Sequence, residues 1–465
     1  MPELLEGSQG VARAVALARP DVVCAYPISP QTHIVEALSR MVRLGQLESC
    51  DYINVESEFG AMSVSIGASA AGGRVYTATA SQGLLYMAEA IYNASGLKLP
   101  IVMTVANRAL GAPINIWNDQ SDSLSQRDSG WLQLFAVDNQ EAIDLHLIAY
   151  KVAEELSLPV MVCMDGFVLT HASDVVELPT QEQVDAYLPP IRPLEKLDVK
   201  EPRSMGMMAG PDVFTETKYL QHMTLVGASK IIRRQADAYA AAMGRDAWQP
   251  VRVWGADSPT ERGGPASEEH PAQQGEIAVI GMGSVMGTMQ AAAPRLREEG
   301  VKTRLVTLGS YRPFPARSVR EAIGTADRVV VLDRALMPGV GGVLSADVRR
   351  SMARLGIPMH SVIAGLGGRS ITERSLAKVL KQAKAGELGE LEFMDLKPEL
   401  VADATTGGRT GSAAAGAANG RAAARAANDG AAPAGAVGGP PAGAAGPGPA
   451  PREAARPSGE AEEAV

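Results

Sequence analysis

The sequence predicts an α/β protein made of two parallel-sheet domains and a tail without regular structure. Residues 1 to about 245 alternate short apolar strands with helices, which is typical of a parallel sheet covered on both faces. A polar segment, 257–274, precedes a second strand–helix series that begins at Glu276. From about Asp403 onward alanine, glycine and proline dominate, and aromatic residues are absent. We therefore expect domains at 1–245 and 276–395, a linker at 246–275 and a disordered tail at 403–465.

The first elements frame a proline-rich turn. A helix is expected at 8–18, a strand at 21–25 and a second helix from about Thr32, with the turn YPISPQ at 26–31 between the last two. Each proline pushes the residue before it out of the helical region, so Ser29 is held at the carboxyl end of a strand, where such sheets bind ligands. An ordinary helix start, with Ser29 as N-cap and Pro30 as the first helical residue, explains the same pattern.

The next three predicted strands also end in polar residues. Strands at 52–55, 75–79 and 101–105 are followed by ESEFGA at 56–61, ASQG at 80–83 and ANRAL at 106–110. Four successive strand ends thus carry a hydroxyl, a carboxylate, an amide and a guanidinium. Because the carboxyl ends of parallel strands meet at one edge of the sheet, these groups predict a binding site there.

The loop at 111–128 is long for an α/β connection, and loops of that length are often functional. Asp119 and Asp122 suggest metal ligands, but no histidine, cysteine or third carboxylate stands at ligand spacing. We expect the loop to form an interface or the wall of a pocket, without a metal site.

The second domain is expected to repeat strand and helix at least three times, with strands at 276–280, 303–307 and 328–332. Right-handed crossovers would make it a smaller parallel sheet. Its segment GMGS at 281–284, with Gly287, is similar to a phosphate-binding glycine turn. The spacing is GxGxxxG rather than GxGxxG, however, and no acidic residue follows at the next strand end. Close packing of strand and helix is therefore favoured over nucleotide binding.

Composition excludes several classes of protein. A formal net charge of -9 without a basic stripe argues against nucleic-acid binding. Cys24, Cys50 and Cys163 are isolated, which argues against a disulfide framework and against an iron–sulfur site of four thiolates. The chain shows no signal peptide and no apolar run near the roughly 20 residues that span a membrane. A cytoplasmic protein that binds no membrane is expected.

Six long motifs carry a family resemblance. They are YPISPQT at 26–32, ESEFGA at 56–61, TASQGLLYM at 79–87, ANRALGAPINIWNDQSDSLSQRD at 106–128, CMDGF at 163–167 and YRPFP at 311–315. Together they resemble the α subunit of the pyruvate:ferredoxin (2-oxoacid:ferredoxin) oxidoreductases over roughly the first 390 residues. The family turn usually reads YPITP, so Ser29 stands where threonine is expected. The resemblance implies a pyrimidine-binding thiamine diphosphate domain, followed by a domain similar to the C-terminal domain of transketolase.

The resemblance also implies roles for single residues. Glu58 would bond to ring nitrogen N1′ of thiamine diphosphate and is the expected catalytic residue. Ser29 and Arg108 would hold the carboxylate of the 2-oxoacid, a task that suits the forked donors of arginine. The other expected cofactor contacts are Pro27, Ile28 and Gln82.

Each of these roles has an ordinary structural alternative. Glu58 could simply be a carboxylate stabilised at a helix N-terminus, and Glu56 is its rival for the catalytic role. Arg108 could pair with Asp119 or Asp122 in the loop that follows.

As a whole, the resemblance implies a subunit of an enzyme that converts a 2-oxoacid, coenzyme A and oxidised ferredoxin into acyl-CoA, carbon dioxide and reduced ferredoxin. Thiamine diphosphate would be shared with a β subunit. Mg²⁺ and the [4Fe–4S] clusters would belong to β, γ and δ chains, because this sequence has neither a GDG-type diphosphate motif nor cluster cysteines.

The segment PINIWND, 113–119, favours pyruvate or a branched-chain 2-oxoacid as substrate. A non-catalytic α/β scaffold subunit and a thiamine enzyme acting alone are the alternative functions. The tail is expected to be dispensable for assembly and turnover.

Overall fold

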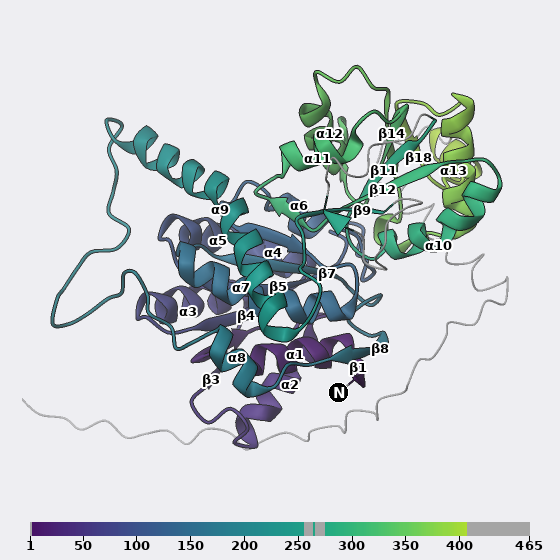
Figure 1. Cartoon of the computed structure of the whole chain (residues 1–465). Helices are drawn as coiled ribbons and strands as arrows, with labels where there is room; N and C mark the ends of the chain where they lie inside the picture. The colour runs from purple at the N-terminus through teal and green to yellow at the C-terminus, as the bar shows by residue number, and fades with distance from the viewer. Residues whose placement is uncertain (1, 255–263, 266–274, 407–465) are drawn as a thin grey trace, which may run out of the picture. The chain divides into compact units, whose positions relative to one another are not determined.

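Two seven-stranded sheets form the framework of the chain (Figure 1). The computed structural model describes residues 2–254, 264–265 and 275–406. Residues 1–395 form one compact unit and residues 396–465 a second, of which α14 (Pro398–Thr406) is described. Among the described helices, none is long and apolar enough to cross a bilayer.

The bounds of the elements in the first unit are as follows. The helices are α1 (Gly7–Leu17), α2 (Thr32–Arg43), α3 (Glu58–Ala70), α4 (Ser81–Tyr86), α5 (Ala88–Gly96), α6 (Ser121–Ser125), α7 (Asn139–Leu156), α8 (Gln181–Tyr187), α9 (Phe214–Met243), α10 (Val285–Glu298), α11 (Ala316–Ile323), α12 (Val343–Met352) and α13 (Glu373–Ala385), with a 3-10 turn at Leu366–Gly368. The strands are β1 (Pro2–Glu6), β2 (Val22–Ala25), β3 (Asp51–Asn54), β4 (Val75–Thr79), β5 (Ile101–Asn107), β6 (Leu132–Phe135), β7 (Val160–Asp165), β8 (Ser173–Glu177), β9 (Val251–Trp254), β10 (Gly264–Pro265), β11 (Ile277–Gly281), β12 (Thr303–Leu308), β13 (Ser310–Arg312), β14 (Arg328–Asp333), β15 (Leu336–Met337), β16 (Gly341–Gly342), β17 (Met359–Ile363) and β18 (Leu391–Phe393).

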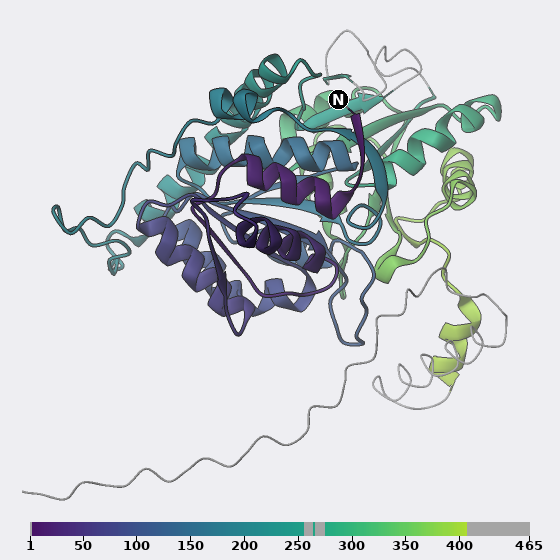
Figure 2. The same ribbon diagram turned by 90° about the horizontal axis from the view of Figure 1, so that it is seen from below.

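The first sheet has the order β13-β6-β7-β5-β4-β2-β3, and all its strands except β13 run parallel. Alternate residues of each strand point to opposite faces, which divides its apolar side chains between two cores. Tyr76, Val102 and Val160 face one core with α1, α2, α7 and α9. Val75, Ile101 and Met161 face the other, with α3, α4 and α5 (Figures 1 and 2). The predicted parallel sheet covered on both faces is confirmed.

The second sheet has the order β10-β9-β12-β11-β14-β17-β18 and repeats this design on a smaller scale. Val279 and Val330 pack with α10 and α13 on one face. Ile280 and Val331, on the other face, pack with α11 and α12 in the same core that holds α3 and α5 of the first sheet. Because this core belongs to both sheets, the two α/β halves are not packed independently.

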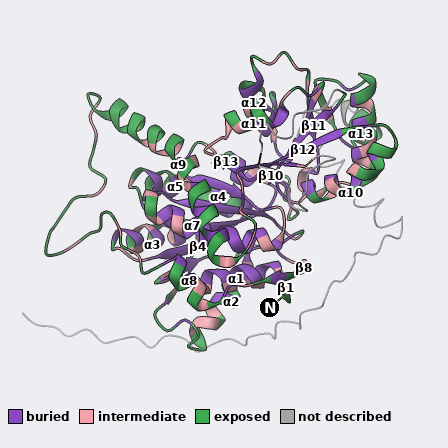
Figure 3. Ribbon diagram, viewed as in Figure 1, coloured by how far each residue is buried: buried purple, intermediate pink, exposed green. Residues whose placement is uncertain are grey.

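Local sequence explains where several helices begin and end. At the start of α7 the Asp138 side chain accepts a 2.7 Å hydrogen bond from the Glu141 amide, and α8 begins with a capping box formed by Thr180 and Gln183. At the end of α9 stands Gly244, whose φ of 66° is left-handed and suits a residue without Cβ. The buried residues of α9 all lie from Ala228 onward, so its first half is open to solvent (Figure 3).

Two of the predicted domain bounds need correction. Val251–Trp254, inside the predicted linker 246–275, form β9 and pair antiparallel with β12, because Val251 and Val253 are apolar and buried in the shared core. Ser310–Arg312, inside the predicted domain 276–395, form β13 and pair with β6 of the first sheet. Aromatic packing favours the pairing of β13 with the first sheet, because the Tyr311 ring meets the Phe135 ring edge-on, with 6.3 Å between the ring centres.

The predicted tail is described only at its start. Residues 403–406 belong to α14, whereas the sequence placed them in the disordered tail. Residues 407–465 lie outside the described part of the chain.

Candidate functional site

The strand ends singled out by the sequence meet at one edge of the first sheet. Strands β3, β2, β4 and β5 are adjacent and parallel, with Ala25 opposite Asn54 and Thr79 opposite Val105 at their last pairs. The segments that follow these four strands therefore share the carboxyl edge, as predicted. Parallel sheets bind ligands at this edge because helix N-termini and loop amides converge there.

The turn at 26–31 is held by its own glutamine. The Gln31 side chain is fully buried and donates a 2.8 Å hydrogen bond to the Tyr26 carbonyl. Gln31, not Ser29, is the N-cap residue of α2, so the alternative of an ordinary helix start at Ser29 is wrong. Ser29 and Pro27 are exposed and Ile28 is half-buried, which leaves these predicted contact residues accessible.

Arg108 and Ser29 are brought together across the edge. The Arg108 guanidinium donates to the Ser29 carbonyl at 3.0 Å and to the Asn115 carbonyl at 2.9 Å. Arg108 is buried, and burial lowers the pKa of its guanidinium while the charge of Asp122 opposes that shift. In the described residues its side chain forms no ion pair with Asp119 or Asp122, so that alternative is wrong. A guanidinium held by two neutral carbonyls keeps its charge available for an anionic ligand.

Asp122 is the anchor of this edge, a role that sequence reasoning missed. Its carboxylate is fully buried and accepts hydrogen bonds from the amides of Ser81 and Arg108 at 2.9 Å and of Ser123 at 2.7 Å, and from the Asn107 side chain at 2.7 Å. Burial raises the pKa of Asp122 to about 6, against these four bonds, which lower it. The bonds tie the loop at 111–128 to the ends of β4 and β5. No sequence signal points to them, because the partners Ser81 and Asp122 stand 41 residues apart.

Glu58 lies at the start of α3 and its carboxylate points into the edge. The hydroxyl of Ser57 caps the helix by accepting from the Gly60 amide at 3.1 Å. Glu58 is only 8% exposed, whereas its rival Glu56 is exposed. Among the described residues the Glu58 carboxylate has no hydrogen-bond or ion-pair partner, although a buried charge is costly without one. Glu58 therefore has the free acceptor that a cofactor nitrogen requires.

The position of the Glu58 carboxylate depends on a glycine. A Cβ at Gly83 would stand 2.6 Å from Glu58 Oε1 and 2.6 Å from Thr79 Oγ1. Thr79 Oγ1 is buried and has no hydrogen-bond partner within the described part of the chain, which makes it a second unused polar atom at the same point. Glu58, Thr79 and Gly83 thus meet at the ends of β3 and β4, and thiamine diphosphate, with its ring nitrogens, fits the acceptor that Glu58 offers.

Gln82 lies in the first turn of α4, next to Gly83. It is exposed, and its Oε1 accepts a hydrogen bond from the Ser81 hydroxyl. Its Nε2 lies 2.7 Å from the position that a Cβ at Gly111 would take, so Gln82 reaches the start of the 111–128 loop. The structure therefore places all the predicted contact residues on one edge, with Ser29 and Arg108 in direct contact and Glu58 and Gln82 in the first turns of α3 and α4, the helices that follow β3 and β4.

The glycine turn of the second sheet contacts the first sheet. Asp165, at the end of β7, accepts from the Ser284 amide at 2.8 Å and from Arg334 at 2.6 Å. Gly283 has a φ of 74°, and a Cβ there would stand 2.8 Å from Asp165 Oδ2. This agrees with the interpretation of GMGS as a packing turn, and it gives Arg334 a role that the sequence did not reveal.

Comparisons with known proteins agree with this architecture. Residues 13–237 match the thiamine diphosphate-binding family of pyruvate flavodoxin/ferredoxin oxidoreductases, and residues 275–376 match pyruvate:ferredoxin oxidoreductase core domain II. Pyruvate synthase subunit PorA of Methanosarcina barkeri is 42% identical over 407 residues, which cover 86% of this chain and 97% of the relative. Ketoisovalerate oxidoreductase subunit VorA of Pyrococcus horikoshii is 37% identical over 403 residues, 85% of this chain and 98% of the relative.

A solved structure shares the fold at much lower identity. The 2-oxoglutarate:ferredoxin oxidoreductase of Magnetococcus marinus aligns with a TM-score of 0.60 and 18% identity over 82% of this chain and 65% of that chain. The predicted family resemblance is confirmed by the relatives of high identity. The chain belongs to the pyruvate (2-oxoacid):ferredoxin oxidoreductase family and is an α subunit of the PorA type, part of a multi-subunit enzyme.

Proposed function

We propose that the carboxyl edge of the first sheet is this subunit's half of a thiamine diphosphate site, with Glu58 as the residue that bonds the cofactor's N1′ nitrogen. The observation that carries the proposal is the buried Glu58 carboxylate, which has no partner among the described residues and packs closely against Gly83. When bound, thiamine diphosphate supplies the carbanion that attacks the keto carbon of a 2-oxoacid. Glu58 orients the pyrimidine ring and holds the proton shared with N1′.

Arg108 and Ser29 are proposed to bind the carboxylate of the 2-oxoacid. Arg108 is fixed by the carbonyls of Ser29 and Asn115, so its geometry is set before substrate arrives. Its charge lacks a carboxylate partner in the described residues, and an anionic substrate would supply one. Pro27, Ile28 and Gln82 complete the contacts to the pyrimidine side of the cofactor.

Partner chains complete the reaction in this proposal. A β-type chain contributes the diphosphate and Mg²⁺ half of the site, because no GDG motif stands in this sequence. Further γ- and δ-type chains contribute the [4Fe–4S] clusters that pass electrons to ferredoxin, since the three cysteines here are all buried and separate. Coenzyme A accepts the acyl group, and pyruvate or a branched-chain 2-oxoacid is the substrate.

The test uses the assembled complex, obtained by co-expression with candidate β, γ and δ chains. We expect Glu58→Gln to abolish pyruvate-dependent viologen reduction and to weaken thiamine diphosphate binding in equilibrium dialysis, while the subunits still co-purify. Glu56→Gln is the matched control, because it removes an exposed carboxylate two residues away. Equal effects of the two variants would show that the cofactor nitrogen does not meet Glu58. Comparing kcat/KM for pyruvate, 3-methyl-2-oxobutanoate and 2-oxoglutarate identifies the substrate.

A further inference from the structure

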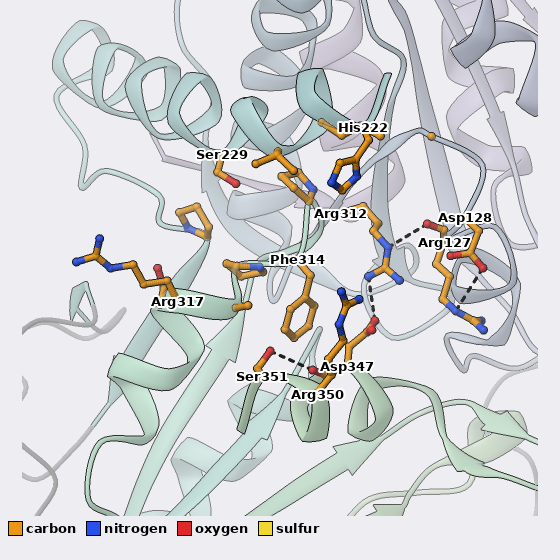
Figure 4. Close-up of a pocket in the computed structure, with 18 of the residues that line it drawn as sticks. Arg127, Asp128, His222, Ser229, Arg312, Phe314, Arg317, Asp347, Arg350 and Ser351 are labelled. Carbon is orange, nitrogen blue, oxygen red and sulfur yellow. Dashed lines mark hydrogen bonds and ion pairs between the residues drawn. The ribbon is translucent and has the colours of Figure 1, made fainter. Parts of the chain in front are cut away.

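A large cavity lies at the opposite, amino edge of the first sheet. It has a volume of about 870 Å³. Its walls are the segment 127–131 that leads into β6, the middle of α9, the loop after β13 with the start of α11, and the last turns of α12 (Figure 4). Since β6 runs parallel to the strands that carry the Glu58 site, the segment before β6 lies at the other end of the sheet. The cavity is therefore separate from the thiamine edge.

The cavity is strongly basic in an acidic chain. Seven lysines and arginines line it, against two carboxylates, whereas the chain carries a formal net charge of -9. Both carboxylates already have partners. Asp347 accepts from Arg312 at 3.0 Å and from the Tyr311 hydroxyl at 2.8 Å, and Asp128 lies 3.9 Å from Arg127. The seven cations are Arg127, Lys218, Arg233, Arg312, Arg317, Arg320 and Arg350.

Three of these arginines come from three different helices. Arg233 lies on α9, Arg320 on α11 and Arg350 on α12. In the described part of the chain their side chains form no hydrogen bond and no ion pair. A solitary surface arginine is usually just solvated. Here the three converge on one concave space, where like charges repel and where concave low-dielectric walls concentrate anions.

One wall of the cavity is apolar and rigid. Phe314 stands between Pro313 and Pro315, and its ring packs edge-on against the buried Tyr311 ring at 6.0 Å. Figure 4 shows Phe314 among the residues that line the cavity, together with Arg312 and Arg350. A fixed aromatic ring beside arginines offers a stacking surface for a planar group and donors for phosphate oxygens. The volume also lies within the range of small-molecule sites.

We propose that this cavity binds a ligand of the nucleoside diphosphate class, with its phosphates on Arg233, Arg320 and Arg350 and its base against Phe314. Two phosphates supply the negative charge that the cavity lacks, and the base covers the apolar wall. The group can come from a free nucleotide or from a larger cofactor that contains one, such as coenzyme A. The site does not depend on the proposed thiamine site, because no residue is shared between them.

The experiment measures binding of ADP to the assembled complex by isothermal titration calorimetry. We expect the double variant Arg320→Gln/Arg350→Gln to lose about tenfold or more in ADP affinity, as removal of two charged donors predicts. Inorganic pyrophosphate should show the same loss. Arg354→Gln is the matched control, since Arg354 is exposed just beyond α12 and does not line the cavity, and it should leave the affinity unchanged.

Two further arms sharpen the test. Phe314→Leu should weaken binding of ADP but not of pyrophosphate, because only the base meets the ring. Coenzyme A added to the ADP-loaded wild-type complex identifies the source of the group: displacement of ADP indicates the cofactor, and lack of displacement indicates a free nucleotide. Glu58→Gln should bind ADP normally, so a failure of the thiamine proposal is distinguishable. Lack of saturable ADP binding, or wild-type affinity in the double variant, would overturn the proposal.

Discussion

Glu58 and Gly83 are packed so closely that a single methyl group on Gly83 would stand 2.6 Å from Glu58 Oε1. The same methyl group would meet Thr79 Oγ1 at 2.6 Å, at the end of the buried strand β4. Real Cβ atoms do not approach other atoms this closely, so either the carboxylate or the strand end must move. The strand is held by its ladder of hydrogen bonds, and the side chain of Glu58 yields first.

Gly83→Ala should therefore displace the Glu58 carboxylate without unfolding the chain. We expect at least about a tenfold loss of kcat, since a catalytic group moved by about 1 Å loses much of its effect. Gly67→Ala on the same helix as Glu58 is the control, because no atom lies within 4 Å of the position of its Cβ. That variant should keep full activity. Steady-state kinetics of the two variants in the assembled complex measure the effect. An unchanged kcat in Gly83→Ala would show that the position of the Glu58 carboxylate does not matter for catalysis.

Arg108 offers a test of substrate binding. Arg108→Ala should raise the KM for pyruvate by a factor corresponding to about 2–4 kcal/mol, the cost of leaving a bound carboxylate without its charged partner. Arg108→Lys keeps the charge but loses the forked donors, and we expect an intermediate KM. The kinetics are measured with pyruvate in the assembled complex. Pyruvate kinetics that are the same in all three proteins would exclude Arg108 from the carboxylate site.

The ion pair between Asp165 and Arg334 joins the two sheets and should contribute to stability. Their atoms lie 2.6 Å apart and both side chains are almost fully buried, at 1% and 5% exposure. Arg334→Ala leaves a buried carboxylate without its counter-charge, which we expect to cost about 3–5 kcal/mol of unfolding free energy. Arg334→Met with Asp165→Asn removes both charges and should cost clearly less. Denaturant unfolding of each variant checks the order, and equal losses in both would show that the pair is not coupled.

His146 predicts a pH dependence of stability. Its ring is fully buried, with Nδ1 donating to the Ala142 carbonyl at 2.6 Å and Nε2 accepting from the Thr104 hydroxyl at 2.5 Å. Burial lowers the pKa of His146 to about 4, so the folded state keeps the ring neutral where the unfolded chain takes up a proton. The stability from this residue is complete above the unfolded pKa of about 6.5 and is lost as the pH falls toward 4.

The expected loss is on the order of 3 kcal/mol between pH 7 and pH 4, from a shift of about two and a half pKa units. His146→Gln removes the titrating group, so its unfolding free energy should fall less over the same interval. Chemical denaturation at several pH values measures the two slopes. Parallel profiles in the two proteins would show that His146 is not the group responsible.

Several elements follow from sequence alone because their causes are local. The strand at 75–79 and the helix at 8–18 are found within two residues of their predicted bounds, since runs of apolar residues and helix periodicity depend on neighbours in the chain. The convergence of four polar strand ends follows in the same way, because alternating strand and helix leads to a parallel sheet. Ser29, Glu58, Gln82 and Arg108 are for this reason named correctly as residues of one edge.

Tertiary structure alone decided the contacts between residues that are far apart in sequence. Whether Glu56 or Glu58 turns inward depends on how α3 packs against the sheet, and the partner of Arg108 depends on where the loop at 111–128 settles. Asp122 has four donors from three segments, and β13 pairs with a strand more than 170 residues earlier, so no local pattern encodes either arrangement. The sequence determined which polar side chains reach the carboxyl edge of the sheet. Packing determined which of them are buried there and which contacts they make.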